Sequence, residues 1–417
     1  MAHVAMLPLG SAGDVFPFLS LGKALLQRGH RVTMITACLF ETAARQAGVE
    51  FVSMGTEEEF DALARDPRLW KMAAGTKLVF EYAGRTAERY FRAIEGLRDA
   101  GAAPDLIMAP MTAFAGRMAR EKWGTPFVTV HLQPAALMSA YEMPVLAPGM
   151  QYLRRAPLWL KKAMLRFPNP VDLVSAPLLK KLCAEVGISP PRSLWRDWWN
   201  SPDGVLLLYP EWFAPPQPDW PEPRLQWDFP LEDLRAEQPL GAELIRFLDD
   251  QSEPPVVITA GSANLQAKDH FAVLVEGLRR TGKPGVLVTR DLSQLPSELP
   301  PNMLPVEYAP FGPLLERSAA LVHHGGIGTL SQAFAAGVPQ LIFPLAHDQF
   351  DNADRLERLG AGLSLSKRRL QPARIAAKLE QLLGDPSIRT AAQGLAARLS
   401  GTRNEGVCEW LESRIRA

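Results

Sequence analysis

One short stretch of the chain combines residue types that could bind a phosphate. The sequence HHGGIGT occupies positions 323–329, after an apolar strand pattern at 319–322 and before a helical pattern at 330–336. Glycines let backbone N–H groups approach an anion closely, and the helix that follows directs its positive end to the same place. The stretch therefore predicts a diphosphate site, to which His324 and the Thr329 hydroxyl add side-chain donors.

Two common phosphate motifs do not fit this stretch. A Walker loop needs a lysine directly before its Ser or Thr, whereas Gly328 precedes Thr329. The dinucleotide fingerprint needs a third glycine where Ser331 stands, and an acidic residue after the next strand, which ends in Pro344. An NTPase and a nicotinamide dehydrogenase are therefore disfavoured. A tight turn whose glycines serve only packing is the remaining alternative.

The stretch and its surroundings resemble the donor-binding signature of family 1 glycosyltransferases, which have the GT-B fold. The matching segments are HGGIGT at 324–329, GVP at 337–339 and DQ at 348–349, and YAP at 308–310 stands where the family has Trp-Ala-Pro. The resemblance implies a donor site made of Ser262, Tyr308, Ala309, His324, Gly326, Gly328, Thr329, Gln332, Asp348 and Gln349. It also implies that the nucleobase stacks on Tyr308 and pairs with the next backbone amide.

The same resemblance assigns the rest of the donor. His324 and Thr329 would bind the diphosphate, Gln332 would lie over the ribose, and Asp348 with Gln349 would hold the hydroxyls of the transferred sugar. Many uridine-nucleotide enzymes have Glu at the ribose position, whereas the amide here offers one acceptor and two donors. We therefore expect a UDP- or dTDP-linked sugar, with a preference for dTDP or mixed use.

The first loop of the N-terminal half supplies a candidate base. Its sequence GSAGDVFPF at 10–18 resembles the Gly-x-x-Gly-Asp-Val-x-Pro pattern of the bacterial rhamnosyltransferase (rhamnolipid-type) and sterol-type branch. An inverting transfer needs a group that takes the proton of the acceptor hydroxyl, which puts Asp14 forward as that base. Burial would have to raise the pKa of this carboxyl for the role. Alternatively, Asp14 caps a helix that begins near Pro17.

The acceptor side is predicted less directly. Phe16 in the same loop and His131 at a strand end are candidate acceptor contacts, although a lone histidine at a strand end is more often a satisfied structural residue. Residues 135–200 contain four tryptophans, which favours a small apolar acceptor such as a phenolic, a sterol or a hydroxy-fatty-acid lipid. The basic and apolar stretch 153–166 is either a membrane-surface segment or a solvated helix face.

Composition and length are those of a two-domain α/β protein. For 417 residues we expect an acceptor-binding Rossmann-like domain over 1–212, a proline-rich linker over 213–235, a nucleotide-sugar-binding domain over 236–395 and a C-terminal helix over 396–417 that returns to the first domain. The two domains would face a cleft. Equal numbers of basic and acidic residues argue against nucleic acid. Three scattered cysteines, with neither a membrane span nor a signal peptide recognised, favour a cytoplasmic protein.

These observations together predict an inverting, metal-independent glycosyltransferase without a cofactor. It would move a hexose or deoxyhexose from the nucleotide sugar to a hydroxyl of the apolar acceptor, as a monomer or homodimer. Two alternatives are a non-catalytic partner that binds nucleotide sugar, and a nucleotide-sugar 2-epimerase on the same fold.

Overall fold

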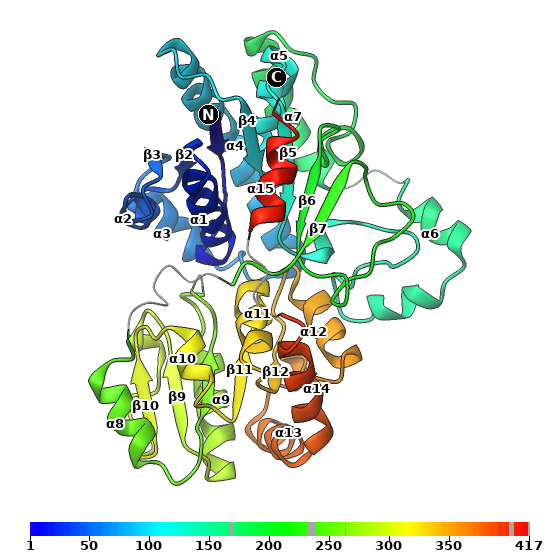
Figure 1. The fold of residues 1–417 in the computed structure, drawn as a ribbon. Helices are drawn as coiled ribbons and strands as arrows, with labels where there is room; N and C mark the ends of the chain where they lie inside the picture. Colours follow the sequence, from blue (N-terminus) through cyan, green and yellow to red (C-terminus); the bar gives the residue numbers. More distant parts are fainter. Residues whose placement is uncertain (167–169, 232–238, 263, 400–403, 416–417) are drawn as a thin grey trace. The chain divides into compact units, whose positions relative to one another are not determined.

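The computed structural model describes residues 1–166, 170–231, 239–262, 264–399 and 404–415, and the chain divides into two compact units (Figure 1). The first unit consists of Met1–Pro144, Tyr152–Pro230 and Arg403–Ala417. The second consists of Val145–Gln151 and Leu231–Thr402. Each unit is a parallel sheet flanked by helices, as the sequence predicts.

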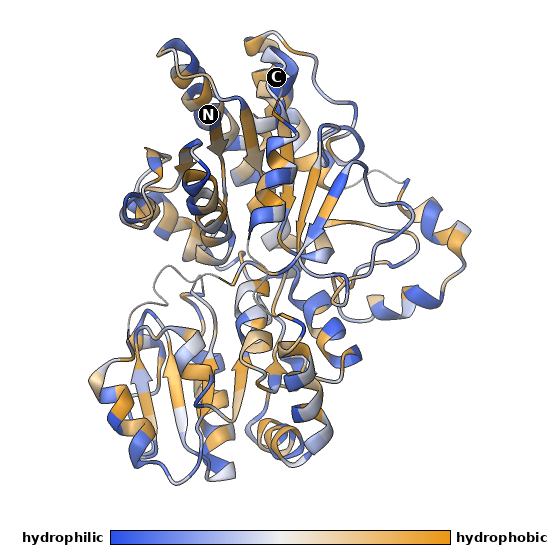
Figure 2. Cartoon of the chain, in the orientation of Figure 1, coloured by the Kyte–Doolittle hydropathy of each residue, from blue (hydrophilic) through white to orange (hydrophobic). Residues whose placement is uncertain are grey.

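The first unit contains a seven-stranded sheet in the order β3-β2-β1-β4-β5-β6-β7, and all neighbouring strands run parallel. Its strands are β1 (His3–Met6), β2 (Arg31–Thr36), β3 (Glu50–Ser53), β4 (Leu106–Ala109), β5 (Phe127–His131), β6 (Val205–Leu208) and β7 (Arg224–Trp227). The central strands are mostly apolar, and β4 (LIMA) and β6 (VLLL) consist of buried apolar residues alone (Figure 2). Such runs are typical of parallel strands that are covered on both faces.

The first unit contains eight α-helices within the described residues. They are α1 (Ala12–Gln27), α2 (Glu41–Gln46), α3 (Glu57–Ala64), α4 (Met72–Asp99), α5 (Phe114–Trp123), α6 (Leu158–Met164), α7 (Pro170–Val186) and α15 (Glu405–Glu412). Of these, α1, α4 and α5 contribute buried apolar side chains to the core of the unit. The last helix lies beside α1, where the Glu412 carboxylate accepts a hydrogen bond of 2.6 Å from Arg28 Nε. The end of the chain thus belongs to the first unit.

The second unit contains a six-stranded parallel sheet in the order β10-β9-β8-β11-β12-β13. Its strands are β8 (Val256–Thr259), β9 (Gly285–Val288), β10 (Met303–Val306), β11 (Ala320–His323), β12 (Gln340–Ile342) and β13 (Gly362–Ser364). Its helices are α8 (Ala242–Asp250), α9 (Lys268–Thr281), α10 (Phe311–Leu315), α11 (Ile327–Ala335), α12 (Gln349–Arg358), α13 (Pro372–Gly384) and α14 (Pro386–Ala396). The stretch 323–329, which is predicted to bind a phosphate, begins at the end of β11, one of the two middle strands of this sheet.

Three sequence-based boundaries are wrong. α1 begins at Ala12 and contains Pro17, so Asp14 lies in its first turn and not in a loop before it. α11 begins at Ile327, three residues earlier than the apolar pattern suggests, because glycine and threonine can occupy a first helical turn. Strand β7 lies inside the expected linker, since its four residues carry no proline; residues 232–235 of that linker lie outside the described residues.

Among the described residues, no helix is both long enough and apolar enough to cross a bilayer.

Candidate functional site

The turn between β11 and α11 presents a row of backbone donors. Gly326 is the N-cap of α11, and the Leu330 N–H is the first to reach an intrahelical acceptor, the Gly326 carbonyl, at 3.0 Å. The N–H groups of Ile327, Gly328 and Thr329 lie in the first turn, where a helix offers them no acceptor of its own. That first turn carries no acidic side chain, so the positive end of the helix is uncompensated. This geometry is suited to an anion.

The His324 ring lies between two glycines beside this turn. A Cβ atom on Gly261 would stand 2.4 Å from His324 Cε1, and one on Gly326 would stand 2.5 Å from His324 Nε2. Neither position therefore tolerates a side chain without displacing the ring. Burial, together with the nearby charge of His347, lowers the pKa of His324 to about 4. The imidazole is therefore neutral at physiological pH.

His323 is a structural residue of the turn that sequence reasoning missed. Its Nδ1 accepts a hydrogen bond of 3.2 Å from the Gly325 N–H, and its Nε2 donates to Gln340 Oε1 at 2.9 Å. Gly325 has a φ of +94°, which favours glycine, and a Cβ there would stand 2.7 Å from Ile342 Cγ2. Because the sequence pattern ended the strand at Val322, it gave no sign that His323 faces inward.

We expect the protein to lose stability as the pH falls from 6.5 to 5. Burial lowers the pKa of His131 to about 4, of His323 to about 3 and of His324 to about 4. Below pH 6.5 the unfolded chain binds protons that the folded histidines do not take up, so acid favours unfolding. At pH 5 each histidine should cost about 2 kcal/mol. Urea unfolding at pH 7 and pH 5 measures the effect.

The His131→Asn variant provides the control for this pH effect. It should remove about one third of the loss between the two pH values, since one of the three buried histidines is gone. Equal free energies of unfolding at both pH values would show that these imidazoles are not held neutral.

The loop between β12 and α12 carries the predicted sugar-binding pair. Asp348 is the N-cap of α12, and its Oδ2 accepts a hydrogen bond of 2.7 Å from Asn352 Nδ2. The Asn352 amide also donates to the Gly325 carbonyl at 2.9 Å, which ties this helix to the glycine turn. His347, before the pair, has a φ of +58°, a conformation that is uncommon outside glycine and often found at functional sites. Asn352 is a second residue that the sequence reasoning missed.

Gln349 and Gln332 already have partners in the protein. Gln349 Oε1 accepts from the N–H groups of Leu345 and Ala346 at 2.7 and 3.1 Å, so it shapes the loop. Gln332 Nε2 donates to the Leu231 carbonyl at 3.0 Å. A contact of either side chain with a donor sugar or ribose would use its remaining polar atoms, or would replace these bonds.

The other predicted donor residues follow neighbouring strands. β8 pairs with β11 so that Thr259 lies opposite His323, and Ser262 follows in an exposed position beside the glycine turn. Tyr308 follows β10, the edge strand, with 40% of its surface exposed, while Ala309 is buried. The short helix α10 after them packs against α11. The segments that follow the strands of one sheet at its carboxyl edge therefore carry all ten predicted donor residues, with Gln332 one turn into α11.

Both halves of the chain are similar to domains of known proteins. Residues 4–141 match the glycosyltransferase family 28 N-terminal domain, and residues 285–405 match the C-terminal domain of erythromycin biosynthesis protein CIII-like proteins. An O-mycaminosyltylonolide 6-deoxyallosyltransferase from Streptomyces fradiae is 29% identical over 100% of this chain and 99% of its own. This chain is a glycosyltransferase.

Further similarities agree with this family and its fold. The sterol 3-beta-glucosyltransferase of Candida albicans is 25% identical over 88% of this chain, which spans only 24% of that longer protein. The crystal structure of the glycosyltransferase VinC in complex with dTDP superposes with a TM-score of 0.70 at 21% identity, covering 99% of this chain and 100% of that one. The GT-B fold and the resemblance to glycosyltransferases that the sequence predicts are thus confirmed.

The glycosyltransferase holds Asp14 in a confined position at the start of α1. Its Oδ2 accepts hydrogen bonds from the Ser11 N–H at 2.8 Å and from Ser11 Oγ at 3.2 Å. Gly10 has a φ of +139°, and a Cβ there would stand 2.2 Å from the same oxygen. Burial raises the pKa of Asp14, against the opposing effect of the two Ser11 bonds. Asp14 thus stabilises the first turn of a helix that starts at Ala12, and it also has the raised pKa that a base requires.

The two predicted acceptor contacts differ in their surroundings. His131 is 1% exposed, and its Nε2 donates to Asn200 Oδ1 at 2.7 Å. This geometry favours the structural interpretation of that histidine. Phe16 is half-buried on α1, with its ring edge-on to Phe40 at 6.2 Å between centroids. A contact with an acceptor remains a prediction for both residues.

Within the second unit of the glycosyltransferase, α12 also anchors the segment Val145–Gln151. Asp351 is fully buried; its Oδ2 pairs with Arg355 Nε at 2.6 Å, and its Oδ1 accepts a 2.9 Å bond from the Val145 N–H. Asp351→Ala should lower the free energy of unfolding by about 3–5 kcal/mol, because it leaves a buried guanidinium without this carboxylate. Urea unfolding measures this loss.

The same helix provides a matched control for Asp351. Asp354 and Arg358 form an ion pair with the same i,i+4 spacing at 3.1 Å, but its arginine is 45% exposed. Asp354→Ala should cost less than about 1 kcal/mol, as exposed pairs do. If both variants lose the same free energy of unfolding, burial does not make the Asp351 pair more important for stability than the exposed pair.

Proposed function

We propose that this glycosyltransferase moves a hexose or deoxyhexose from a dTDP- or UDP-linked sugar to a hydroxyl of a small apolar acceptor, with inversion at the anomeric carbon. The observation that carries the proposal is the turn from β11 into α11. Three first-turn N–H groups, a helix end without acidic side chains and the neutral His324 ring converge there. Such a site would bind the diphosphate and stabilise it as a leaving group.

In this mechanism Asp14 accepts the proton. The acceptor oxygen attacks the anomeric carbon as its O–H proton passes to the Asp14 carboxylate. The bond between the anomeric carbon and the diphosphate oxygen breaks, and its electron pair leaves with the nucleoside diphosphate. The helix end and His324 stabilise the charge that develops on that oxygen, so no metal ion is required.

The relatives support the preference for dTDP and for an apolar acceptor. The Streptomyces relative is named for transfer of a 6-deoxyallosyl group to O-mycaminosyltylonolide, the Candida relative is named for glucose transfer to a sterol, and VinC was crystallised with dTDP. An amide at position 332 fits dTDP as well as UDP. Rhamnose as the sugar, a cytoplasmic location and a monomeric or homodimeric state also remain predictions.

Mass spectrometry of products tests the reaction. The protein is incubated with dTDP-glucose, dTDP-rhamnose or UDP-glucose and with phenolic, sterol or hydroxy-fatty-acid acceptors. We expect a glycoside together with free nucleoside diphosphate, and an NMR coupling constant of the anomeric proton that reports inversion. Donor binding without a product from any acceptor would favour a non-catalytic partner. Conversion of the nucleotide sugar to its 2-epimer without acceptor would favour the epimerase.

A further inference from the structure

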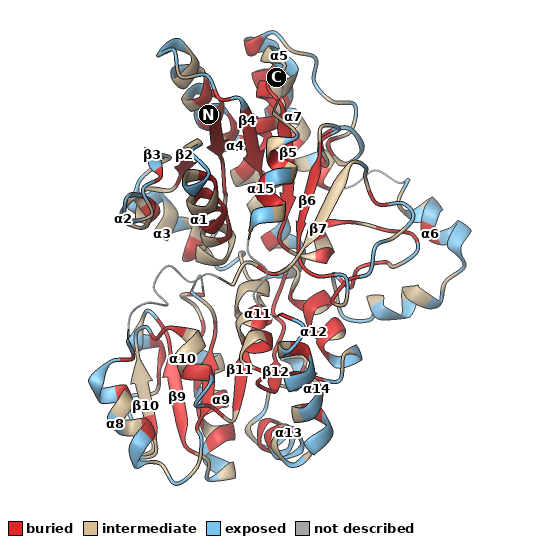
Figure 3. Cartoon of the chain, viewed as in Figure 1, coloured by how far each residue is buried: buried red, intermediate tan, exposed pale blue. Residues whose placement is uncertain are grey.

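The helix α6 in the first unit faces solvent with its apolar residues. Trp159 is 71% exposed, Leu158 and Leu160 are each 37% exposed, and Met164 is 38% exposed. Tyr152, in the turn before it, is 66% exposed. Figure 1 shows α6 at the end of a connection that stands away from the first sheet, and Figure 3 shows most of its surface exposed.

The residue that α6 buries is a lysine. Lys161 is 6% exposed, and its Nζ lies 3.5 Å from the carbonyl oxygens of both Tyr141 and Arg154. A helix of a water-soluble protein normally buries its apolar face and exposes its lysines. On α6 this arrangement is inverted, because a cation anchors the helix while tryptophan, leucine and methionine side chains meet solvent. Several large apolar side chains exposed on one short segment are typical of an interaction surface.

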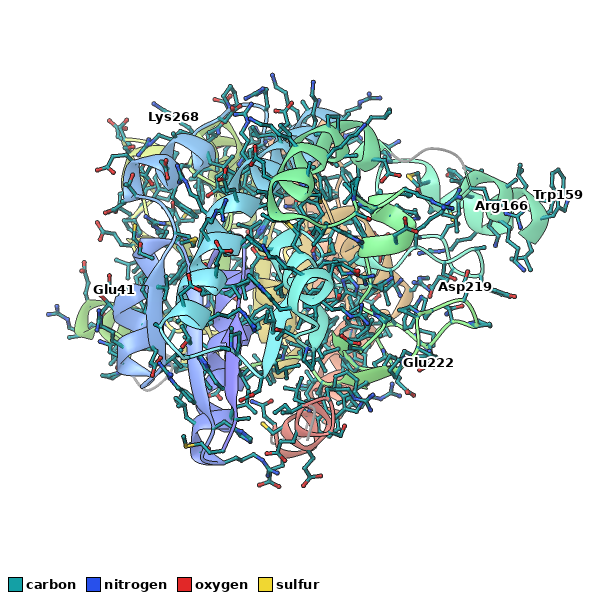
Figure 4. The ribbon with its side chains drawn as sticks, turned by 90° about the horizontal axis from the view of Figure 1, so that it is seen from above. Glu41, Trp159, Arg166, Asp219, Glu222 and Lys268 are labelled. Carbon is teal, nitrogen blue, oxygen red and sulfur yellow. The ribbon has the colours of Figure 1, made fainter. Side chains whose placement is uncertain are left out.

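The charged residues of the segment that contains α6 all have the same sign. Between Glu142 and Asp172 the sequence contains Arg154, Arg155, Lys161, Lys162 and Arg166 and no acidic residue, although the whole chain has no net charge. Arg155, Lys162 and Arg166 are exposed. Figure 4 shows Trp159 and Arg166 on the outer part of this projection. We define the α6 patch as Tyr152, Leu158, Trp159, Leu160 and Met164 with Arg155, Lys162 and Arg166.

We propose that the α6 patch docks on a membrane surface that contains anionic lipids. Tryptophan and tyrosine prefer the headgroup level, where leucine and methionine can enter the acyl boundary. Arginine and lysine beside them would contact anionic headgroups while their stems lie along apolar surface. A second copy of the chain fits less well, because a twofold contact would bring the cations of one patch against those of the other. Docking of this patch goes beyond the proposed sugar transfer and does not depend on it.

Flotation of the full chain with lipid vesicles tests this surface. Vesicles of phosphatidylcholine with 30% phosphatidylglycerol are compared with vesicles of phosphatidylcholine alone, at low and high salt. We expect binding to the anionic vesicles only, weakened by salt. Trp159→Ser and Lys162→Glu should each lower the partition coefficient about tenfold, because each removes an anchor or reverses a charge at the bilayer.

The second unit supplies matched controls for both variants. Leu292 is an exposed leucine and Lys268 an exposed lysine, both outside the α6 patch. Leu292→Ser and Lys268→Glu should bind vesicles as the wild type does. The proposal is overturned if the wild type ignores anionic vesicles, if neutral vesicles bind it equally well, or if the patch variants match the controls. Thermal melts of all variants establish that each is folded.

Discussion

Replacing Asp14 by Asn should lower the rate constant of sugar transfer by about 10²–10⁴-fold and leave the affinity for the donor unchanged. The amide keeps an oxygen that can accept from the Ser11 N–H, so the first turn of α1 should remain intact. It cannot take a proton from an acceptor hydroxyl at neutral pH. Initial rates at saturating donor and acceptor, with calorimetric titration of the nucleotide in parallel, separate chemistry from binding.

A second capping box in the chain provides the control for Asp14. Glu59 stands at the equivalent position of α3, where it pairs with the exposed Thr56 N-cap. Glu59→Gln should change neither rate nor binding. If Asp14→Asn behaves like Glu59→Gln and retains near-normal turnover, Asp14 serves only the helix start and another group takes the proton. A raised pKa of Asp14 also predicts an acidic limb of the rate profile above the usual pKa of aspartate.

Replacing Gly326 by Ala should weaken binding of the donor nucleotide by about 10–100-fold. The backbone at Gly326, with φ of −63° and ψ of 140°, is open to alanine, so the fold should tolerate the change. The new methyl group would stand 2.5 Å from His324 Nε2 and would displace the ring from the anion site. Loss of hydrogen bonds to a charged diphosphate has an effect of this size. Calorimetric titration with dTDP and UDP gives the affinities.

Gly241 provides a matched control because it is the N-cap of α8 with nearly the same backbone, φ of −58° and ψ of 144°. A Cβ at Gly241 would meet no atom within 4 Å. Gly241→Ala should therefore bind nucleotide normally and should not lower stability. Equal affinities for Gly326→Ala and Gly241→Ala would place the diphosphate elsewhere on the protein.

The parts of the site that the sequence predicts are those that depend on local backbone. Gly326, Gly328 and Thr329 can be recognised because a strand, a glycine turn and a helix follow one another directly along the chain. The parallel strands then carry Ser262 and Asp348 to the same sheet edge as the turn. Nothing beyond strand order is needed to bring these segments together.

The parts that the sequence does not predict depend on contacts between distant residues. Asn352 and His323 act on Gly325 through hydrogen bonds, which no spacing rule indicates. The Asp351 bond to Val145 joins positions 206 residues apart. On α6, the sequence shows the basic and apolar residues but not which of them face solvent, because that depends on where Lys161 finds its carbonyl partners. Pattern alone would have placed the leucines inside.

Hydrogen-exchange mass spectrometry with saturating dTDP or UDP tests whether the turn from β11 into α11 binds the donor diphosphate. We expect slower amide exchange with nucleotide in peptides that cover 324–330 and 345–352, and no change in α13, which carries no predicted donor residue. Nucleotide binding without protection of the 324–330 amides would show that the diphosphate does not bind at this turn.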